Sequence, residues 1–175
     1  MQKMLIAAVL LAGATGQALA ATDFYSTAGL QFSRAGEPFD LNDGGYQLGL
    51  GYVINNQWSA ELTAEQLFDK EESENGTTVG LDTSALTLAA LGKTNVSDST
   101  VLYYRAGVSQ LNHQAHIIVN NQKTAADDTQ LHALLGLGLE QNFSERWFGR
   151  AEVVHLFKKN QLQADTVRLS LGYRF

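Results

Sequence analysis

The stretch VRLSLGYRF, residues 167–175, decides the fold that the sequence predicts. Every second residue from Val167 to Phe175 is apolar, and arginine, serine or glycine stands between them. Because successive side chains of a β-strand point to opposite faces, this alternation predicts a strand with one apolar face and one polar face. The apolar phase runs to the last residue and ends on two aromatic side chains, Tyr173 and Phe175.

Seven further segments of the chain have strand character, and helical signals are weak. Six of them alternate clearly with a period of two, whereas the phase of the segment at about 81–92 is ambiguous. The segments cover residues 24–33, 44–54, 58–68, 81–92, 100–110, 131–141 and 146–157. With the last strand they predict an all-β fold of eight antiparallel strands.

The N-terminus has the features of a secretory signal peptide. Residues 1–20 contain one basic residue, Lys3, then an apolar run from Met4 to Ala12, and they end on Ala18-Leu19-Ala20, a small-x-small cleavage motif. An N-terminal membrane anchor is the alternative, but the apolar run is short of the roughly 20 residues that a spanning helix needs. We therefore expect a signal peptide at 1–20 and one domain at 21–175.

Composition excludes several classes of protein. The formal charge is −6, and it becomes −7 without the signal, which contains Lys3 and no acid. A chain this acidic is not expected to bind nucleic acid. There is no cysteine, so neither disulfides nor thiolate metal sites are expected. No cofactor is expected.

The connections alternate between short and long, and this pattern indicates a membrane barrel. NNQ, KTNVSDS and NFSER form the shorter connections, after Ile54, Gly92 and Gln141. AGEPFDLND, DKEESENGTT, the stretch 112–128 and KKNQLQ form the longer ones. Short periplasmic turns and longer extracellular loops are typical of barrels in the outer membrane of Gram-negative bacteria.

Charge decides which face of the strands points to lipid. One face carries nearly all the strand charges, and an Arg or Lys facing mid-bilayer costs roughly 2–4 kcal/mol. The charged face is therefore predicted to line the lumen, and the apolar face to meet outer-membrane lipid and lipopolysaccharide. The predicted lumen residues are Glu61, Glu65, Arg105, Glu140, Arg150, Glu152, Arg168 and Arg174. A periplasmic lipocalin-like barrel, apolar inside, is the alternative.

Aromatic side chains are predicted to form two belts on the outside of the barrel, one at each membrane interface. The periplasmic belt would comprise Phe24, Tyr52, Trp58, Trp147, Tyr173 and Phe175, and the outer belt Phe32, Tyr46, Phe68 and Phe157.

The sequence resembles the small eight-stranded outer-membrane barrels, the family of the outer membrane protein A barrel, outer membrane protein X and the attachment-invasion proteins. The segments that carry the resemblance are LSLGYRF at the end, GLGLEQNFSERWFGRAEVVHLFKKN at 136–160, GYVINNQWSAEL at 51–62 and VLYYRAGVS at 101–109. The resemblance implies that Tyr173 and Phe175 form the signal that the barrel-assembly machinery recognises. It also implies host-surface or phage ligands at the extracellular loops.

Two roles for the lumen charges stay open. Four acids and four arginines give a neutral set, and an eight-stranded interior is only just wide enough for side chains, so the charges must pair. The first role is a structural ion-pair plug. The second, implied by the resemblance, is a small gated pore in which Glu61, Glu140 and Arg150 exchange partners. In that comparison Ala90 takes the place of a basic gate residue, and Arg105 would substitute for it.

An enzyme and a metal site are weaker alternatives. Lipid A deacylases share this size, but His155 and His132 lack the nearby serine that such catalysis needs. His113, His116, Asp127 and Asp128 lie in a predicted loop, without the supporting shell that a metal site usually has. We expect no catalytic and no metal-binding residues. The working part is instead predicted to be the loops, with acidic residues at 69–74, Lys158 and Lys159, and a strand edge at HIIVNN, residues 116–121.

Overall fold

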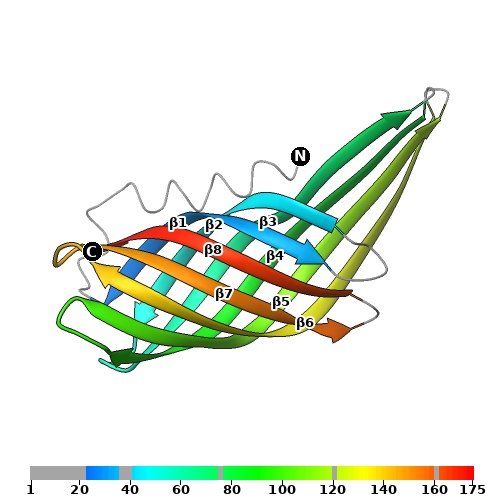
Figure 1. Ribbon diagram of the computed structural model, residues 1–175. Helices are drawn as coiled ribbons and strands as arrows, with labels where there is room; N and C mark the ends of the chain where they lie inside the picture. Colours follow the sequence, from blue (N-terminus) through cyan, green and yellow to red (C-terminus); the bar gives the residue numbers. More distant parts are fainter. Residues whose placement is uncertain (1–22, 36–40, 75–76, 120–121, 160–161) are drawn as a thin grey trace.

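A computed structural model describes residues 23–35, 41–74, 77–119, 122–159 and 162–175, and it contains eight β-strands (Figure 1). Among these residues no helix is long and apolar enough to cross a membrane. The strands are β1 (Phe24–Ala35), β2 (Leu41–Val53), β3 (Trp58–Glu74), β4 (Thr77–Asn95), β5 (Thr100–Val119), β6 (Gln122–Asn142), β7 (Trp147–Lys159) and β8 (Leu162–Arg174).

Each strand pairs antiparallel with its neighbours in sequence, and β1 pairs with β8, so the sheet closes into a barrel. The predicted all-β fold of eight antiparallel strands is confirmed. A line of register partners that starts at Leu139 of β6 and passes once around the barrel returns to β6 at Thr129, ten residues away. This stagger is the shear that tilts the strands and lets eight of them enclose a narrow, side-chain-filled interior.

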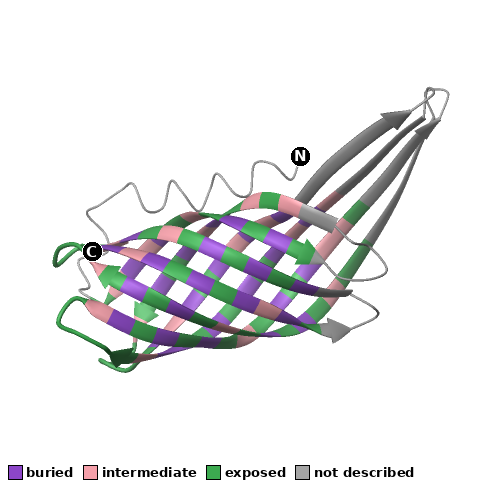
Figure 2. Ribbon diagram, viewed as in Figure 1, coloured by how far each residue is buried: buried purple, intermediate pink, exposed green. Residues whose placement is uncertain are grey.

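Burial alternates along the strands, as a two-residue period requires (Figure 2). The strand β4, whose phase the sequence left ambiguous, turns Thr83, Ala85, Thr87, Ala89 and Leu91 inward, and Leu86, Leu88 and Ala90 outward. Its ambiguity has a physical reason: both faces are largely apolar, and they differ in side-chain size more than in polarity.

Three short turns join the strands at the end of the barrel that we assign to the periplasm, and all three use the same device. In each, the first backbone N–H bonds a carbonyl four residues on, as Ile54 does with Trp58 at 2.9 Å. The side-chain oxygen of Asn55, Ser97 or Ser144 then accepts bonds from backbone N–H groups of the turn. Short polar side chains favour such turns because they satisfy backbone donors locally.

The opposite ends of the strands correct the sequence interpretation. Strands β3 to β6 are 17 to 21 residues long, well beyond the roughly 9–11 that a membrane-crossing strand needs. Their hairpins project from the barrel as a four-stranded extension (Figure 1). Most residues of the predicted loops, including 112–119 and 122–128, are therefore strand. The sequence hid this because strands outside the membrane need no apolar face, so their alternation disappears.

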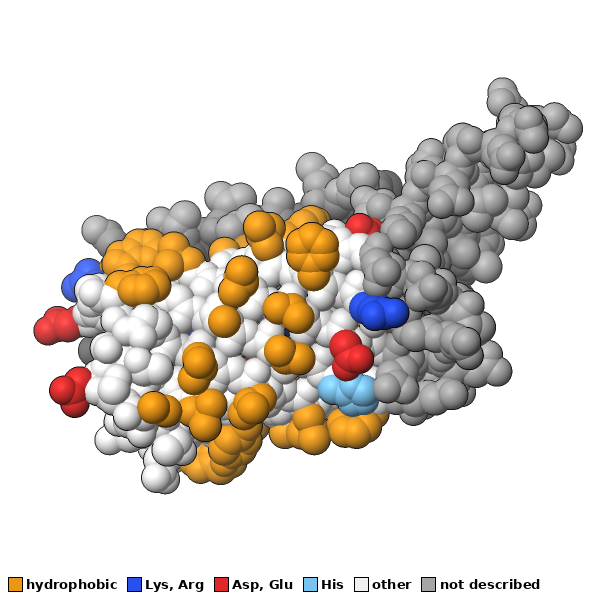
Figure 3. Space-filling model, viewed as in Figure 1, with side chains coloured by type: hydrophobic (Ala, Val, Ile, Leu, Met, Phe, Trp, Pro, Cys, Tyr) orange, Lys and Arg blue, Asp and Glu red, His pale blue; other side chains and the backbone are white. Residues whose placement is uncertain are grey.

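The outer wall is apolar across its middle, with charged and histidine side chains toward its ends (Figure 3). Leu30, Phe32 and Leu169 are among its most exposed side chains. The predicted periplasmic belt forms ring pairs, with centroids 5.0 Å apart for Phe24–Tyr52 and 4.9 Å for Trp147–Tyr173. At the extracellular end Phe32, Tyr46 and Phe157 are exposed, whereas the side chain of Phe68 lies outside the described part.

Candidate functional site: the barrel lumen

The lumen contains the strand charges. Glu61, Glu65, Arg105, Glu140, Arg150, Glu152 and Arg168 each expose 5% or less of their surface, and Arg174 is half-buried at the periplasmic mouth. They come from β3, β5, β6, β7 and β8 and all point inward because they share the polar phase of their strands. Charges removed from water need partners, so the arrangement of these pairs determines what the lumen can do.

The charges form one continuous chain in which acid and base alternate. It begins at Glu65, whose Oε2 accepts a bond from Nη2 of Arg168 at 2.6 Å, and Arg168 reaches Glu152 at 3.8 Å. Glu152 then accepts from Nε of Arg105 at 2.6 Å, and Nη2 of Arg105 donates to Glu61 at 2.6 Å. In this way three carboxylates and two guanidinium groups alternate across the narrow interior, and the remaining negative charge at Glu61 is balanced by the next cation, Arg150.

The chain continues to the periplasmic mouth through Arg150. Its Nη1 donates to Oε2 of Glu61 at 2.7 Å, and its Nε donates to Oε2 of Glu140 at 2.8 Å. Glu140 also accepts from Nη2 of Arg174 at 2.6 Å. Lys93 of β4 lies 3.5 Å from the same carboxylate. Three cations therefore surround one acid at this end.

Lys93 is a charged lumen residue that the sequence interpretation missed. The sequence pattern predicts KTNVSDS as a turn, but β4 continues to Asn95 and carries Lys93 on the inward phase. Ala90, which the family comparison placed at the basic gate position, points outward instead. The inward basic residue of β4 is Lys93, three positions later, and with it the described lumen holds five cations and four acids.

Aromatic rings pack against Arg150 from several directions. Its guanidinium carbon lies 4.9 Å from the ring centroid of Tyr25, 5.1 Å from that of Tyr103 and 4.8 Å from that of Phe148. The Tyr25 hydroxyl also donates to Glu61 at 2.9 Å. Cations attract the faces of aromatic rings, and more strongly where water is excluded. Arg150 is consequently held by two carboxylates and three rings together.

A second layer, made of apolar side chains, fills the lumen on the extracellular side of the charges. Its members are buried and in mutual contact: Leu67, Ala85, Leu111, Leu134, Val154, Leu156 and Ala164. Leu67 enters this layer at an irregularity in the β3–β4 register between Gln66 and Phe68. In the outer half of the barrel the inward face therefore combines this apolar cluster with buried polar side chains such as Gln31, Thr166 and His132. An apolar constriction opposes the passage of ions because it disfavours water.

The histidines named as weak catalytic or metal candidates are dispersed. His132 is buried in the lumen, with Nδ1 3.2 Å from the carbonyl oxygen of Phe157. His113 lies on β5 rather than in a loop, 3.0 Å from the Thr83 hydroxyl. His155 is on the outer wall and pairs with Asp165 at 2.6 Å. In the part of the chain that is described, no group of three potential metal ligands comes together. The side chains of His116 and Asp127 lie outside it.

The predicted assembly signal lies at the periplasmic end of β8. The ring of Tyr173 packs between Trp147 and Phe175, with centroid distances of 4.9 Å and 5.7 Å. The backbone N–H of Phe175 donates to the carbonyl of Phe24 at 3.1 Å, which ties the end of β8 to β1. Both aromatic side chains are partly exposed, so they are accessible from outside the barrel wall.

A closed eight-stranded barrel with an apolar wall and a charged interior defines a small transmembrane β-barrel. Residues 5–175 match the model of the outer membrane protein beta-barrel domain family, and the chain belongs to this family. It is therefore a protein of the Gram-negative outer membrane, as predicted. No curated protein sequence matches the chain significantly.

Solved structures share the fold at low sequence identity. One is Ail, the attachment invasion locus protein of Yersinia pestis, in complex with the heparin analogue sucrose octasulfate: 22% identity, a TM-score of 0.68, and coverage of 87% of this chain and 98% of Ail. Another is the N-terminal barrel domain of Pseudomonas aeruginosa OprF, with 15% identity, a TM-score of 0.64, and coverage of 88% and 98%. Neisserial surface protein A follows, with 12% identity, a TM-score of 0.67, and coverage of 87% and 97%.

Proposed function

We propose that this protein is a non-enzymatic surface protein of the outer membrane, with a sealed lumen and an extracellular sheet that contacts ligands. The observation that carries the proposal is the double closure of the lumen. The chain of ion pairs fills the periplasmic half, and the apolar layer around Leu111, Leu134 and Leu156 fills the next level. With the interior blocked in this way, the exterior of the barrel is the part available for function.

The extension formed by β3 to β6 supports a role in contact with other molecules. Strand β3 pairs with β2 only as far as Gln66, although β3 itself continues to Glu74. Strand β6 begins at Gln122, but its pairing with β7 starts at Leu134. Among the described pairs, both outer strands of the extension thus have backbone groups with no neighbouring strand. Such an edge can take up an extended segment of another chain by strand addition.

Charge indicates which partners this extension favours. Residues 34–43, 68–84, 112–130 and 158–165 together contain eleven acidic and five basic residues. Opposite charges steer association, and like charges oppose it. We therefore infer a cationic, extended polypeptide as the ligand class, in contrast to the sulfated heparin analogue in the Ail complex.

Binding to the nanodisc-embedded protein tests this proposal. A labelled peptide of alternating lysine and valine should bind, whereas sucrose octasulfate should not. A variant with Asp69→Asn, Glu71→Gln, Glu72→Gln and Glu74→Gln should bind the peptide more weakly. The matched control neutralises two acids on the periplasmic turns, Asp98→Asn and Glu145→Gln, and should bind like the wild type. Octasulfate binding, or equal peptide binding by all proteins, would refute the ligand class.

A small gated pore is the second candidate function, and one observation favours it. Glu140 is shared by Arg150, Arg174 and Lys93, so its pairing can change without leaving a buried carboxylate alone. A redistribution among these partners would loosen the ion-pair layer at the periplasmic mouth. The apolar layer would still have to open for ions to pass, and for this reason we rank the pore second.

A further inference from the structure

We propose that a groove on the outer wall, over β6, β7 and β8, binds one acyl chain of a phospholipid of the periplasmic leaflet, with the lipid phosphate at Arg146. Nothing in the proposed function requires this site, since it lies outside the lumen and at the opposite end from the extension. The proposal rests on the shape of the groove, on the polarity of its periplasmic end and on the position of one cation.

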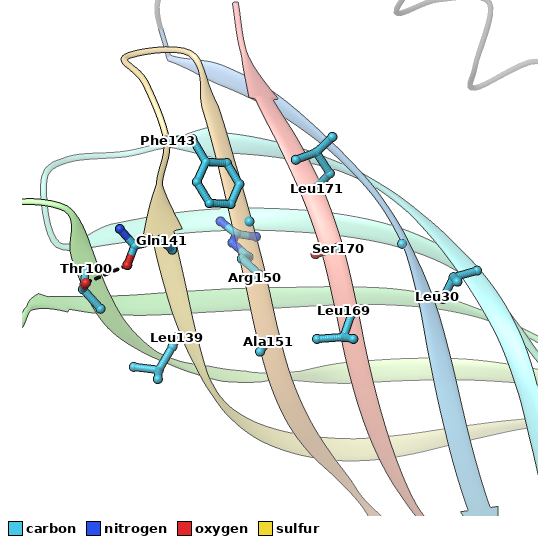
Figure 4. A pocket seen from close by; sticks show the side chains of 12 residues that line it. Leu30, Thr100, Leu139, Gln141, Phe143, Arg150, Ala151, Leu169, Ser170 and Leu171 are labelled. Atoms are coloured by element: carbon cyan, nitrogen blue, oxygen red, sulfur yellow. Dashed lines mark hydrogen bonds between the residues drawn. The ribbon is translucent and has the colours of Figure 1, made fainter.

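The shape follows from two small residues on the outward phase of β7. Gly149 stands between Gln141 of β6 and Leu171 of β8 in the register, and Ala151 stands between Leu139 and Leu169. At these positions β7 therefore carries only a hydrogen atom and a methyl group, while the side chains of β6 and β8 on either side are large. Figure 4 shows Leu139 and Leu169 on either side of Ala151, and these residues line a pocket together with Leu30 and Phe143.

The width of the groove suits a single hydrocarbon chain. Neighbouring strands of a sheet lie about 4.8 Å apart, so the two leucine-bearing strands are separated by roughly 9.6 Å across β7. The leucine side chains occupy part of this distance, and the width that remains between them fits one extended acyl chain. Because the groove lies in the apolar wall, where membrane lipid is the surrounding solvent, an acyl chain is the occupant that its chemistry favours.

The periplasmic end of the groove is polar, as a site for a whole lipid requires. Thr100 and Gln141 lie on the outward phase of their strands, and the Thr100 hydroxyl donates to Oε1 of Gln141 at 2.8 Å (Figure 4). Phe143 limits the groove at this end, since a Cβ added to Gly149 would lie 2.8 Å from its ring. The polarity of the groove therefore increases from the leucines to the Gln141 amide. A phospholipid changes in the same direction, from its acyl chain to its ester and headgroup.

One cation stands where the lipid phosphate would lie. The turn 143–146 between β6 and β7 ends on Arg146, whose side chain is exposed and whose Nη1 donates to the Tyr173 hydroxyl at 3.1 Å. The other two short turns contain no cation, and the turn 96–99 contains Asp98. Guanidinium groups are well suited to phosphate, which they can bind through two N–H groups. The same turn carries Glu145, so its net charge is zero, and what distinguishes it from the other two is the guanidinium group of Arg146, held at the wall by Tyr173.

The two tryptophans of the chain allow a direct test. Trp147 lies on β7, two residues from Gly149, whereas Trp58 lies on β3, four strands away, and packs against Tyr104. The variant Trp58→Phe leaves Trp147 as the reporter of the groove, and Trp147→Phe leaves Trp58 as the reporter of ordinary wall. Each protein is refolded into phosphatidylcholine vesicles that contain increasing fractions of dibrominated phosphatidylglycerol, whose bromines quench tryptophan fluorescence.

We expect Trp147 to be half-quenched at a several-fold lower fraction of the brominated lipid than Trp58. Filling the groove with Ala151→Leu should abolish this difference, whereas Ala106→Leu, which adds the same side chain to the wall on β5, should preserve it. Arg146→Gln should remove the preference of Trp147 for brominated phosphatidylglycerol over brominated phosphatidylcholine. Equal quenching of both reporters, or a difference that survives Ala151→Leu, would overturn the proposal.

A second copy of the chain is the competing occupant of the groove. Cross-linking in the same vesicles distinguishes the two, because an interface between copies would give dimers that Ala151→Leu removes and Ala106→Leu keeps. That result would overturn the lipid site. A monomer whose phospholipid persists through detergent purification and native mass spectrometry, and is lost in Ala151→Leu, would support it. Neither result depends on whether the extension binds a peptide.

Discussion

Arg150 bonds two carboxylates at once, reaching Glu61 at 2.7 Å and Glu140 at 2.8 Å from opposite sides of its guanidinium group. It therefore joins the chain of pairs that begins at Glu65 to the cluster at the periplasmic mouth. The rings of Tyr25, Tyr103 and Phe148 restrict its movement. Arg150 is thus a fixed element of the lumen, whereas Lys93 and Arg174, with side-chain exposures of 14% and 28%, are the cations that can move.

Replacing this residue by Arg150→Met should lower the free energy of unfolding by up to about 3–5 kcal/mol, because it removes the buried cation that Glu61 and Glu140 share and leaves each of them with fewer partners. Lys93→Met should cost clearly less, since Arg150 and Arg174 still contact Glu140. Urea titration in lipid vesicles, followed by the gel shift between folded and unfolded barrel, measures both variants. Equal losses for the two substitutions would contradict the central position of Arg150.

Gly51 provides the space that the Tyr25 ring occupies, since an added Cβ would overlap Cζ of Tyr25. Gly51→Ala should therefore force the ring away from Glu61 and cost about 1–3 kcal/mol of stability, the usual range for overpacking. Gly44→Ala is the matched control, because its nearest neighbour lies at 3.7 Å. If the same urea titration gave Gly51→Ala the stability of the wild type, the close packing of Tyr25 would be disproved.

The extension of β3 to β6 should be dispensable for folding. Deleting 70–81 and joining Asp69 to Asp82 through a short turn, with the same change between Gln114 and Asp127, removes only register pairs beyond the barrel. The shortened chain should refold into vesicles with an unchanged gel shift. It should also no longer bind the labelled lysine–valine peptide. A shortened chain that fails to fold would show that the extension stabilises the barrel.

The sequence predicted the fold well because the membrane imposes a strict pattern. Within the bilayer each strand has one face toward lipid. The alternation of Leu135 and Leu137 with Gly136 and Gly138 therefore indicates which residues of the strand point to lipid and which point to the lumen. Outside the bilayer this constraint ends. The sequence therefore predicts 112–128 as a loop with an exposed strand edge at 116–121, whereas all of these residues that the structure describes are strand. The predicted edge is wrong, because 116–119 pair with β4 on one side and with β6 on the other.

The site was harder to predict than the fold. The arginines and glutamates of the lumen stood out against an apolar partner face, but their pairing depends on contacts across the barrel that register alone determines. Lys93 was missed because β4 continues three residues past Gly92, where its apolar pattern ends. The apolar layer was missed because inward Leu111 and Leu134 resemble outward leucines in a sequence, and only the closed sheet distinguishes them.

The two layers of the lumen should act in series. Glu140→Gln weakens the ion-pair layer and leaves the apolar layer intact, whereas Leu111→Asn with Leu134→Asn hydrates the apolar layer and leaves the ion pairs. Each change alone should give no conductance, and the combination should conduct, because water and ions then have a continuous path. Leu111→Val with Leu134→Val, combined with Glu140→Gln, is the control and should stay silent. Conductance through either single-layer variant would mean that one layer alone seals the barrel.

The most direct test of the sealed lumen is the single-channel current of the wild-type chain in a planar bilayer at neutral pH. The protein is refolded into the bilayer, and its folded state is checked by the gel shift of the unboiled sample. The sealed barrel predicts a silent record from folded protein. Discrete openings, with a frequency that changes when Glu140 or Arg150 is neutralised, would contradict it and make the gated pore the function of this barrel.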